Sequence, residues 1–135
     1  MAGRETLILL DTHALIWLAG EPDKLSRHAT EAIQTADHQG GLGIAAITLW
    51  ELAWLASQGR VEFTGTVEAF VARLTSRTSI RPLTVKIATL AQQLPPGFPT
   101  DPGDRLIGAT ALAEGIPLVT KDRKIRACRQ IKTIW

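Results

Sequence analysis

Hydrophobic positions in this 135-residue chain fall into short continuous apolar runs separated by longer stretches with helical spacing. Short apolar runs without polar interruption are typical of strands buried on both faces. Two such runs predict buried strands over Leu7–Leu10 and Leu42–Ile47, and three shorter or interrupted apolar stretches predict strands over Ile80–Leu83, Pro117–Thr120 and Lys132–Trp135. Since Pro82 has no backbone N–H to donate to a neighbouring strand, we expect the third strand at an edge of the sheet.

Apolar residues that recur three and four positions apart predict the helices between these strands. The expected helices cover Thr12–Leu18, Ser26–Ala36, Leu49–Gln58, Thr66–Arg77, Val85–Leu94, Asp104–Glu114 and Lys121–Cys128. Ser26 and Thr48 are the expected N-caps of the second and third of them, and Pro95–Gly103 is expected to be a loop. Alternating strands and helices predict an α/β fold with a parallel sheet covered by helices on both faces. The length suits one domain over residues 1–135.

Composition limits the class of protein without identifying it. Hydrophobic residues make up 45% of the chain and charged residues 21%, as in ordinary globular proteins. The single cysteine, Cys128, excludes an internal disulfide and fits a reducing compartment. No run approaches the roughly 18 apolar residues of a membrane span. The apolar stretch near the N-terminus is interrupted by Asp11, which makes it too short and too acidic for a signal peptide. We therefore expect a cytoplasmic protein with no membrane partner.

Charge is unevenly distributed. The net charge is only +2, but the segment 121–132 carries six basic residues against one acid, a net +5 that leaves −3 for the rest. A basic segment beside an acidic site suits a protein that binds a phosphate backbone, with Lys121 and Arg123 as candidate phosphate contacts. A solvated helix face with favourable charge at its end explains the same segment equally well.

Four carboxylates, Asp11, Glu51, Asp104 and Asp122, occur at comparable places in the predicted fold. Asp11 and Asp122 each follow a strand, Glu51 lies on the first turn after another, and Asp104 opens the helix before the strand that precedes Asp122. The carboxyl ends of parallel strands share one edge of a sheet, so the four side chains are expected to meet there. Clustered carboxylates repel without a cation, and this many oxygen ligands suit Mg²⁺ or Mn²⁺, not zinc.

Each acid also has a local explanation when taken alone. Asp11 is a suitable helix cap, and Glu51 stands three residues after Thr48, the spacing of a capping box. Asp104 follows Asp101 by three residues with a proline at the first helical position. Asp122 would favour the positive end of its own helix. Shared placement at one sheet edge is the reason for preferring a common site.

The acids also stand within recognisable motifs. These are Asp11-Thr12-His13-Ala14-Leu15-Ile16-Trp17, Trp50-Glu51-Leu52, the run Asp101-Pro102-Gly103-Asp104-Arg105-Leu106-Ile107-Gly108-Ala109-Thr110-Ala111, and Thr120-Lys121-Asp122. In combination they resemble the PIN-domain ribonucleases, most of all the VapC-type toxins of bacterial toxin–antitoxin pairs. The likeness spans nearly the whole chain, with the acids in family order and spacing.

The resemblance implies a three-layer α/β/α sandwich and a Mg²⁺- or Mn²⁺-dependent endoribonuclease whose products carry a 5′-phosphate and a 3′-hydroxyl. Asp11, Glu51, Asp104 and Asp122 take the family's four acidic positions, and Asp101 is a common companion behind them. The resemblance also implies an RNA substrate, with tRNA and rRNA as candidates, a small antitoxin partner and a homodimer. A housekeeping RNA-processing PIN nuclease and a non-catalytic PIN scaffold that binds RNA or protein remain alternatives.

Other candidate residues carry two interpretations each. Thr12 and Thr120 either orient a carboxylate or a bound water, or cap their helices locally. Arg105 either contacts phosphate or pairs with a nearby acid. Trp50 and Trp54 stand four residues apart on one helical stripe. Such a stripe usually packs in the core, but a binding interface is a serious rival because tryptophan is enriched at interaction hot spots.

Overall fold

The computed structural model describes residues 7–135, and its five strands form one parallel sheet. The strands are β1 (Ile8–Leu10), β2 (Leu42–Ala45), β3 (Ser79–Arg81), β4 (Leu118–Val119) and β5 (Thr133–Ile134). Their order across the sheet is β3-β2-β1-β4-β5. Central β1 pairs with strands on both sides, Leu9 standing opposite Gly43 on β2 and Leu118 on β4. The predicted parallel α/β sheet is therefore confirmed, and the strand that precedes Asp11 lies at its centre.

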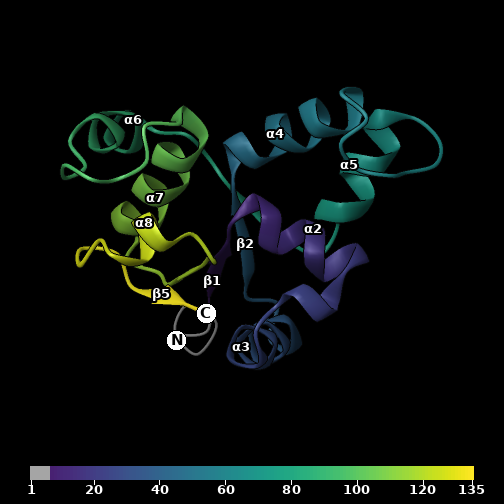
Figure 1. Ribbon diagram of the computed structural model, residues 1–135, viewed down its shortest axis with the longest axis horizontal. Coiled ribbons are helices and arrows are strands. Elements are labelled where there is room, and N and C mark those ends of the chain that lie inside the picture. Colours follow the sequence, from purple (N-terminus) through teal and green to yellow (C-terminus); the bar gives the residue numbers. More distant parts are fainter. Residues whose placement is uncertain (1–6) are drawn as a thin grey trace.

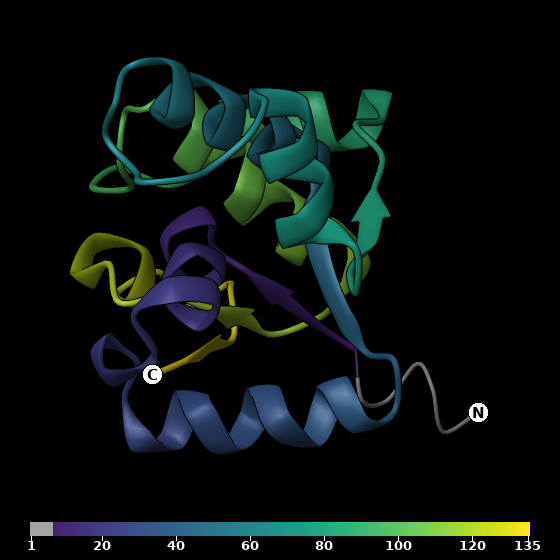
Figure 2. The same cartoon turned by 90° about the vertical axis from the view of Figure 1, so that its right-hand side faces the viewer.

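Helices connect consecutive strands and cover the sheet (Figure 1). They are α2 (Thr12–Gly20), α3 (Arg27–His38), α4 (Ala46–Ser57), α5 (Val67–Thr75), α6 (Val85–Gln92), α7 (Pro102–Glu114) and α8 (Arg123–Arg126), with a 3₁₀ turn at Pro22–Lys24. Figure 1 shows α6, α7 and α8 on one side of β1 and β2 and α2 to α5 on the other. Figure 2 shows α3 lying along the far end of the molecule from α4 and α5.

Side chains of β1 alternate between two cores, which confirms the three-layer arrangement. Ile8 and Leu10 belong to a cluster with residues of α2, α3 and α4, such as Ile33. Leu9 belongs to a second cluster on the opposite face, which includes Ile107 of α7 and Ile125 of α8. Since successive residues of a strand point to opposite faces, three consecutive apolar residues are what a strand buried on both sides requires.

The observed elements differ from the predicted ones mainly at their ends. As expected, β3 is an edge strand, and Pro82 follows it directly. The second strand ends at Ala45, two residues earlier than predicted, so Ile47 lies in α4. Thr48 is wrongly predicted as the cap of that helix: Ala45 occupies the N-cap position without a side-chain hydrogen bond, and Thr48 is fully buried. Ser26, in contrast, accepts the expected bond from Ala29 N–H at 3.0 Å.

The fourth strand is also shorter than predicted, and the sixth predicted helix begins earlier. Helix α7 starts at Pro102 because Asp101 caps it and proline suits the first helical position. Gly115, with φ of 66°, ends the same helix in the left-handed conformation that glycine adopts without strain. None of the helices in residues 7–135 has the length and apolar character needed to cross a membrane.

Candidate active site

Asp11 and Asp122 follow the two strands at the centre of the sheet. Asp11 comes directly after β1, and Asp122 stands three residues after β4. These strands are parallel neighbours, and the backbone N–H of Asp11 donates to Val119 O at 3.0 Å. Both acids therefore lie at the same, carboxyl edge of the sheet, as the sequence predicts.

Thr120 joins the two acids through one hydroxyl. Its Oγ1 donates to Asp11 Oδ2 at 2.7 Å and accepts from the backbone N–H of Asp122 at 3.1 Å. Thr120 is fully buried, so the contact has little freedom to rearrange. Of the two predicted roles for this residue, orienting a carboxylate is the one observed.

Glu51 is held in the same way by two threonines from different elements. Thr12 Oγ1 donates to Glu51 Oε1 at 2.5 Å, and Thr48 Oγ1 lies 2.9 Å from the Thr12 hydroxyl. A hydroxyl has only one hydrogen to donate. Since Thr12 donates its hydrogen to Glu51, the bond between the two threonines must be donated by Thr48 and accepted by Thr12. The capping-box interpretation of Glu51 is wrong, because Glu51 is the sixth residue of α4 and Thr48 lies inside that helix.

Asp101 and Asp104 lie at the start of α7, Asp101 as its N-cap and Asp104 in its first turn. Asp101 Oδ2 accepts from the backbone N–H of Asp104 at 3.0 Å, so the predicted helix start is confirmed. Between them, Gly103 allows the close approach of Glu51: a Cβ at this position would lie 2.1 Å from Glu51 Oε2 and 3.1 Å from Asp101 Oδ2. The start of α7 can thus lie against Glu51 of α4 only because residue 103 has no side chain.

Electrostatics indicate how closely the acids approach one another. Burial, and after it the charges of Asp11, Asp101, Asp122 and Glu51 in that order, together raise the pKa of Asp104 to about 7. Burial also raises the pKa of Asp11, against the lowering effect of the Thr120 hydrogen bond. It raises the pKa of Glu51 against the hydrogen bond from Thr12. The charges of the four predicted acids therefore interact with one another. Four helix caps at separate places would not interact in this way.

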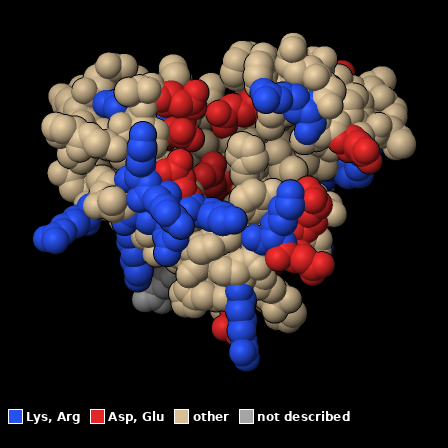
Figure 3. All heavy atoms as spheres, viewed as in Figure 1, with Lys and Arg blue, Asp and Glu red and all other residues tan. Residues whose placement is uncertain are grey.

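The acids open onto a groove of about 1680 Å³ whose lining includes Asp11, Glu51, Asp101 and Asp104. Figure 3 shows acidic side chains gathered in a hollow of the surface, with Lys and Arg gathered beside it over α8. Within residues 7–135, no group of three or more His, Cys, Asp or Glu side chains is arranged to hold a metal ion as it stands. The acids surround the hollow but do not form a finished coordination site.

Helix α8 carries the basic segment and is itself capped by an acid. Asp122 Oδ1 accepts from the backbone N–H groups of Lys124 and Ile125 at 2.8 and 3.0 Å. The local interpretation of Asp122 is thus confirmed together with its place beside Asp11. Lys121 and Arg123 are exposed, and the Lys121 ammonium lies 5.8 Å from the centre of the Trp17 ring at the edge of the groove.

Arg105 forms no ion pair with an acid among the described residues, so one of its two predicted roles is wrong. Its Nε donates to Ala91 O at 2.8 Å and one terminal nitrogen donates to Pro99 O at 3.1 Å. The guanidinium also lies over the ring of Phe98. Arg105 therefore ties α7 to the end of α6 and to the following loop, a structural role that its position beside Asp104 does not reveal.

Trp50 and Trp54 are not core residues, so the default interpretation is wrong for them. Trp50 is 62% exposed and Trp54 41% exposed. Sequence alone misses the cation beside them: the Arg60 guanidinium lies 5.7 Å from the centre of the Trp54 ring. It also misses the true role of Thr48, since no local signal links residues 12, 48 and 51.

Known proteins share this fold and much of this sequence. The PIN domain model matches residues 8–130. Ribonuclease VapC22 of Mycobacterium tuberculosis is 42% identical over 132 residues, covering 96% of this chain and 99% of that protein. The DNA-bound VapBC of Salmonella typhimurium superposes with a TM-score of 0.71 at 23% identity, covering 94% of this chain and 96% of that chain. The DNA-bound VapBC2 of Rickettsia felis gives 0.69 at 18% identity with the same coverage. The match to the family model over nearly the whole chain shows that this protein belongs to the PIN-domain family.

Proposed function

We propose that this protein is an endoribonuclease of the VapC type, the toxin of a toxin–antitoxin pair that inhibits translation, and that its activity depends on Mg²⁺ or Mn²⁺. The observation that carries the proposal is the 42% identity with Ribonuclease VapC22 over almost the full length of both chains. Asp11, Glu51 and Asp104 line one groove, and Asp122 is linked to Asp11 through Thr120, an arrangement that suits the chemistry such an enzyme needs. We also propose that it acts in the cytoplasm, where a toxin that inhibits translation meets its RNA.

The acidic hollow suits a divalent cation. Burial and the charges of four neighbouring acids together raise the pKa of Asp104 to about 7, so ionising all of these carboxylates at once costs free energy. A hard cation with oxygen ligands removes that repulsion. Asp11, Glu51, Asp104 and Asp122 are the residues that would hold it, with Asp101 behind them. When bound, the ion would activate water and stabilise the charge that develops on the phosphate.

The protein's own residues prepare the hollow for this chemistry. Thr120 fixes one oxygen of Asp11 at 2.7 Å, and Thr12 fixes one oxygen of Glu51 at 2.5 Å. Both acids are therefore oriented before any ligand arrives, which lowers the cost of organising the site. Because the pKa of Asp104 is about 7 in the metal-free protein, this carboxyl releases its proton near neutral pH when a cation takes the proton's place.

Basic residues beside the hollow are suited to hold the RNA backbone. Lys121 and Arg123 are exposed at the start of α8, next to Asp122. Contacts of this kind fix the position of a strand without reading its sequence. We therefore assign Lys121 and Arg123 to phosphates on either side of the scissile bond, and prefer them to Arg105, whose Nε and one terminal nitrogen already donate to backbone carbonyls.

We further infer a small antitoxin partner and a homodimer. The structures of Salmonella typhimurium and Rickettsia felis named above are VapBC assemblies, which supports a partner of the antitoxin class. The chemistry of the hollow supports an inhibitor that inserts an arginine, since a guanidinium pairs strongly with carboxylates.

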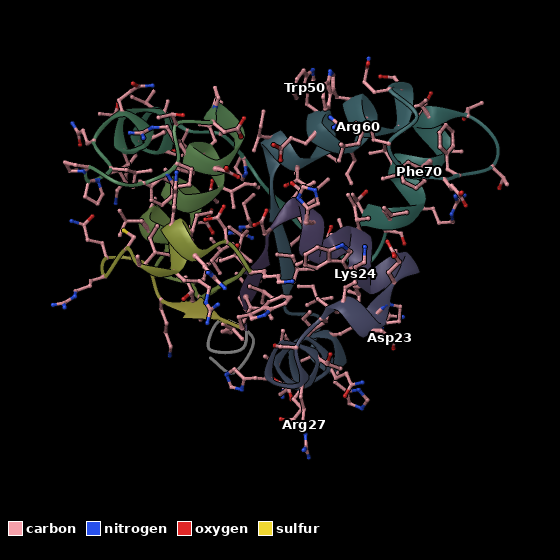
Figure 4. All side chains as sticks on the ribbon, in the orientation of Figure 1. Asp23, Lys24, Arg27, Trp50, Arg60 and Phe70 are labelled. Atoms are coloured by element: carbon pink, nitrogen blue, oxygen red, sulfur yellow. The ribbon has the colours of Figure 1, made fainter. Side chains whose placement is uncertain are left out.

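The test is cleavage of total cellular RNA by the purified protein in Mg²⁺ or Mn²⁺, with mapping of the new ends. We expect 5′-phosphate ends, and loss of cleavage in EDTA or in the Asp11→Asn variant. Asp23→Asn is the matched control, because it makes the same substitution at an exposed position of the 3₁₀ turn that does not line the groove. Figure 4 shows Asp23 at the outer edge of the molecule. Full cleavage in EDTA, or an Asp11→Asn protein as active as wild type, excludes the proposed chemistry.

A further inference from the structure

Trp50 and Trp54 form an exposed aromatic pair on α4. Their rings stack with centres 6.4 Å apart and planes 19° from parallel. Even after stacking, Trp50 keeps 62% of its surface exposed. The buried residues of the same helix, Thr48, Leu52 and Ala56, recur every four positions and face the fold. The packing of α4 therefore directs the two rings outward.

The pair belongs to the acidic groove. Trp50 and Trp54 line it together with Asp11, Glu51 and Asp104. Glu51 is the next residue after Trp50, so the exposed tryptophan pair and a candidate metal ligand lie on the same part of α4. Figure 4 shows Trp50 at the outer rim of the lobe that contains α4, with Arg60 close to it. A strand that enters the hollow along this rim passes the exposed rings.

Cations lie beside two of the aromatic rings that line the groove, those of Trp54 and Trp17. Arg60 lies 5.7 Å from the centre of Trp54 and forms no salt bridge with any described residue. Lys121 lies 5.8 Å from the centre of Trp17 on the α8 side, likewise with no acid paired to it in the part of the chain that the structure describes. Uncompensated cations beside aromatic faces are the combination that proteins use to bind single-stranded nucleic acid.

We propose that Trp50 and Trp54 are a stacking platform for unpaired bases of the RNA strand cleaved in the hollow, with Arg60 contacting an adjacent phosphate. This inference rests on the proposed ribonuclease function and narrows its substrate to RNA that is single-stranded at the site. A paired base exposes no free face to an indole ring, whereas an unpaired one stacks with little regard to sequence.

The cation beside the tryptophans, Arg60, favours RNA over a protein partner at this part of the groove. Exposed tryptophans are also common in protein interfaces, but an apolar protein surface would bury Arg60 without offering it an anion. A phosphate backbone supplies that anion next to the base that stacks. The protein interface is the alternative that the experiment must distinguish.

Binding is measured without cleavage, in EDTA and with Asp11→Asn present in every variant. The probes are an unstructured RNA of about ten nucleotides and a blunt RNA duplex of the same composition, followed by quenching of tryptophan fluorescence and by anisotropy of labelled RNA. We expect Trp50→Leu and Trp54→Leu each to weaken single-strand binding about tenfold and to leave duplex binding unchanged. Trp50→Phe should keep most of the affinity, because phenylalanine retains an aromatic face.

Salt dependence separates stacking from charge. Removing Arg60 in Arg60→Gln should lower the slope of log affinity against log salt by about 0.7, the value for one phosphate on a single strand, whereas Trp50→Leu should leave the slope unchanged. Val85→Ala is the matched control, since Val85 is 86% exposed on α6 and does not line the groove.

Each result decides one hypothesis. Single-strand binding by Trp50→Leu and Trp54→Leu at the wild-type level overturns the platform while leaving the ribonuclease proposal intact. The same outcome accompanied by a change in sedimentation or in antitoxin binding assigns the pair to a protein interface. A wild-type protein that neither binds nor cleaves RNA overturns the proposed function itself.

Discussion

Thr120 donates a hydrogen bond of 2.7 Å to Asp11, a residue 109 positions earlier in the chain. This hydrogen bond links the carboxyl ends of β4 and β1. The same hydroxyl accepts from the backbone N–H of Asp122 at 3.1 Å. One fully buried side chain thus sets the relative position of two of the four acids.

Replacing Thr120 by valine should impair both stability and activity. Thr120→Val keeps the shape of the side chain but leaves the Asp122 N–H without its partner and frees Asp11 to rotate. Losing a buried hydrogen-bond partner costs roughly 1–3 kcal/mol of unfolding free energy, and a misplaced ligand should lower the cleavage rate about 10- to 100-fold. Urea denaturation and RNA cleavage measure the two effects.

The serine variant is the control for this prediction. Thr120→Ser keeps the hydroxyl and should recover most of the cleavage rate, with only the small stability loss expected for one methyl group. Wild-type cleavage by Thr120→Val, alongside reduced stability, would restrict Thr120 to a role in folding.

Gly103 and Glu51 give a second prediction about orientation. A Cβ on residue 103 would lie 2.1 Å from Glu51 Oε2, so Glu51 must move in Gly103→Ala and its hydrogen bond with Thr12 should break. The displaced atom is the end of a flexible side chain, so the fold should survive. Cleavage should fall at least tenfold, and Mn²⁺ should bind more weakly by calorimetry.

Gly20→Ala is the matched control for the added methyl group, because no atom lies within 4 Å of a Cβ at Gly20. It should cleave RNA at the wild-type rate. A Gly103→Ala variant with wild-type cleavage and Mn²⁺ affinity would show that Glu51 needs no fixed position.

The sequence predicts the central strands and the four acids because these features depend on local pattern. The apolar run before Asp11 stops at a carboxylate, and the parallel direction of the strands follows from their alternation with helices. The end of β2 is not predicted: Ala45 and Ala46 continue the apolar run while the backbone turns into α4 without a side-chain cap. A nearby threonine, Thr48, offers a false cap signal.

Contacts between distant residues are the part of the site that the sequence does not reveal. Thr12 is a recognisable neighbour of Asp11, yet its partners are Thr48 and Glu51, 36 and 39 residues away. Helix α4 is also apolar on nearly every side, so periodicity cannot decide whether Trp50 and Trp54 face the core or the groove. Only the burial of Leu52 and its neighbours settles that question.

The relay from Thr48 to Thr12 to Glu51 gives a third prediction. Thr48→Val removes the donor that orients the Thr12 hydroxyl at 2.9 Å, but Thr12 can still donate to Glu51. We therefore expect a smaller loss of cleavage, about three- to tenfold, than for Thr12→Val, which breaks the bond to Glu51 itself. Equal losses for the two variants would contradict this order. Thr30→Val, in a half-buried position of α3 away from the groove, controls for the loss of a hydroxyl.

The raised pKa of Asp104 predicts an unusual pH dependence of stability in the metal-free protein. Its pKa is about 7 in the folded chain, against 3.8 for an ordinary aspartate carboxyl, so between these values the folded state binds more protons than the unfolded state. The free energy of unfolding should therefore fall, through this group, as pH rises from about 4 to about 7, and level off above. Asp11 and Glu51, whose pKa values are also raised, act in the same direction.

The difference between wild type and Asp104→Asn isolates this contribution from the rest of the chain. In EDTA, the melting temperature of Asp104→Asn should exceed that of wild type at pH 8 and the advantage should disappear near pH 4, while Asp23→Asn shows no such crossover. Adding Mg²⁺ should raise the wild-type melting temperature more at pH 8 than at pH 5, because the cation competes with the proton on Asp104. A constant difference between wild type and Asp104→Asn across this range would mean that Asp104 does not titrate near neutral pH, and that the acids lie too far apart to require a cation.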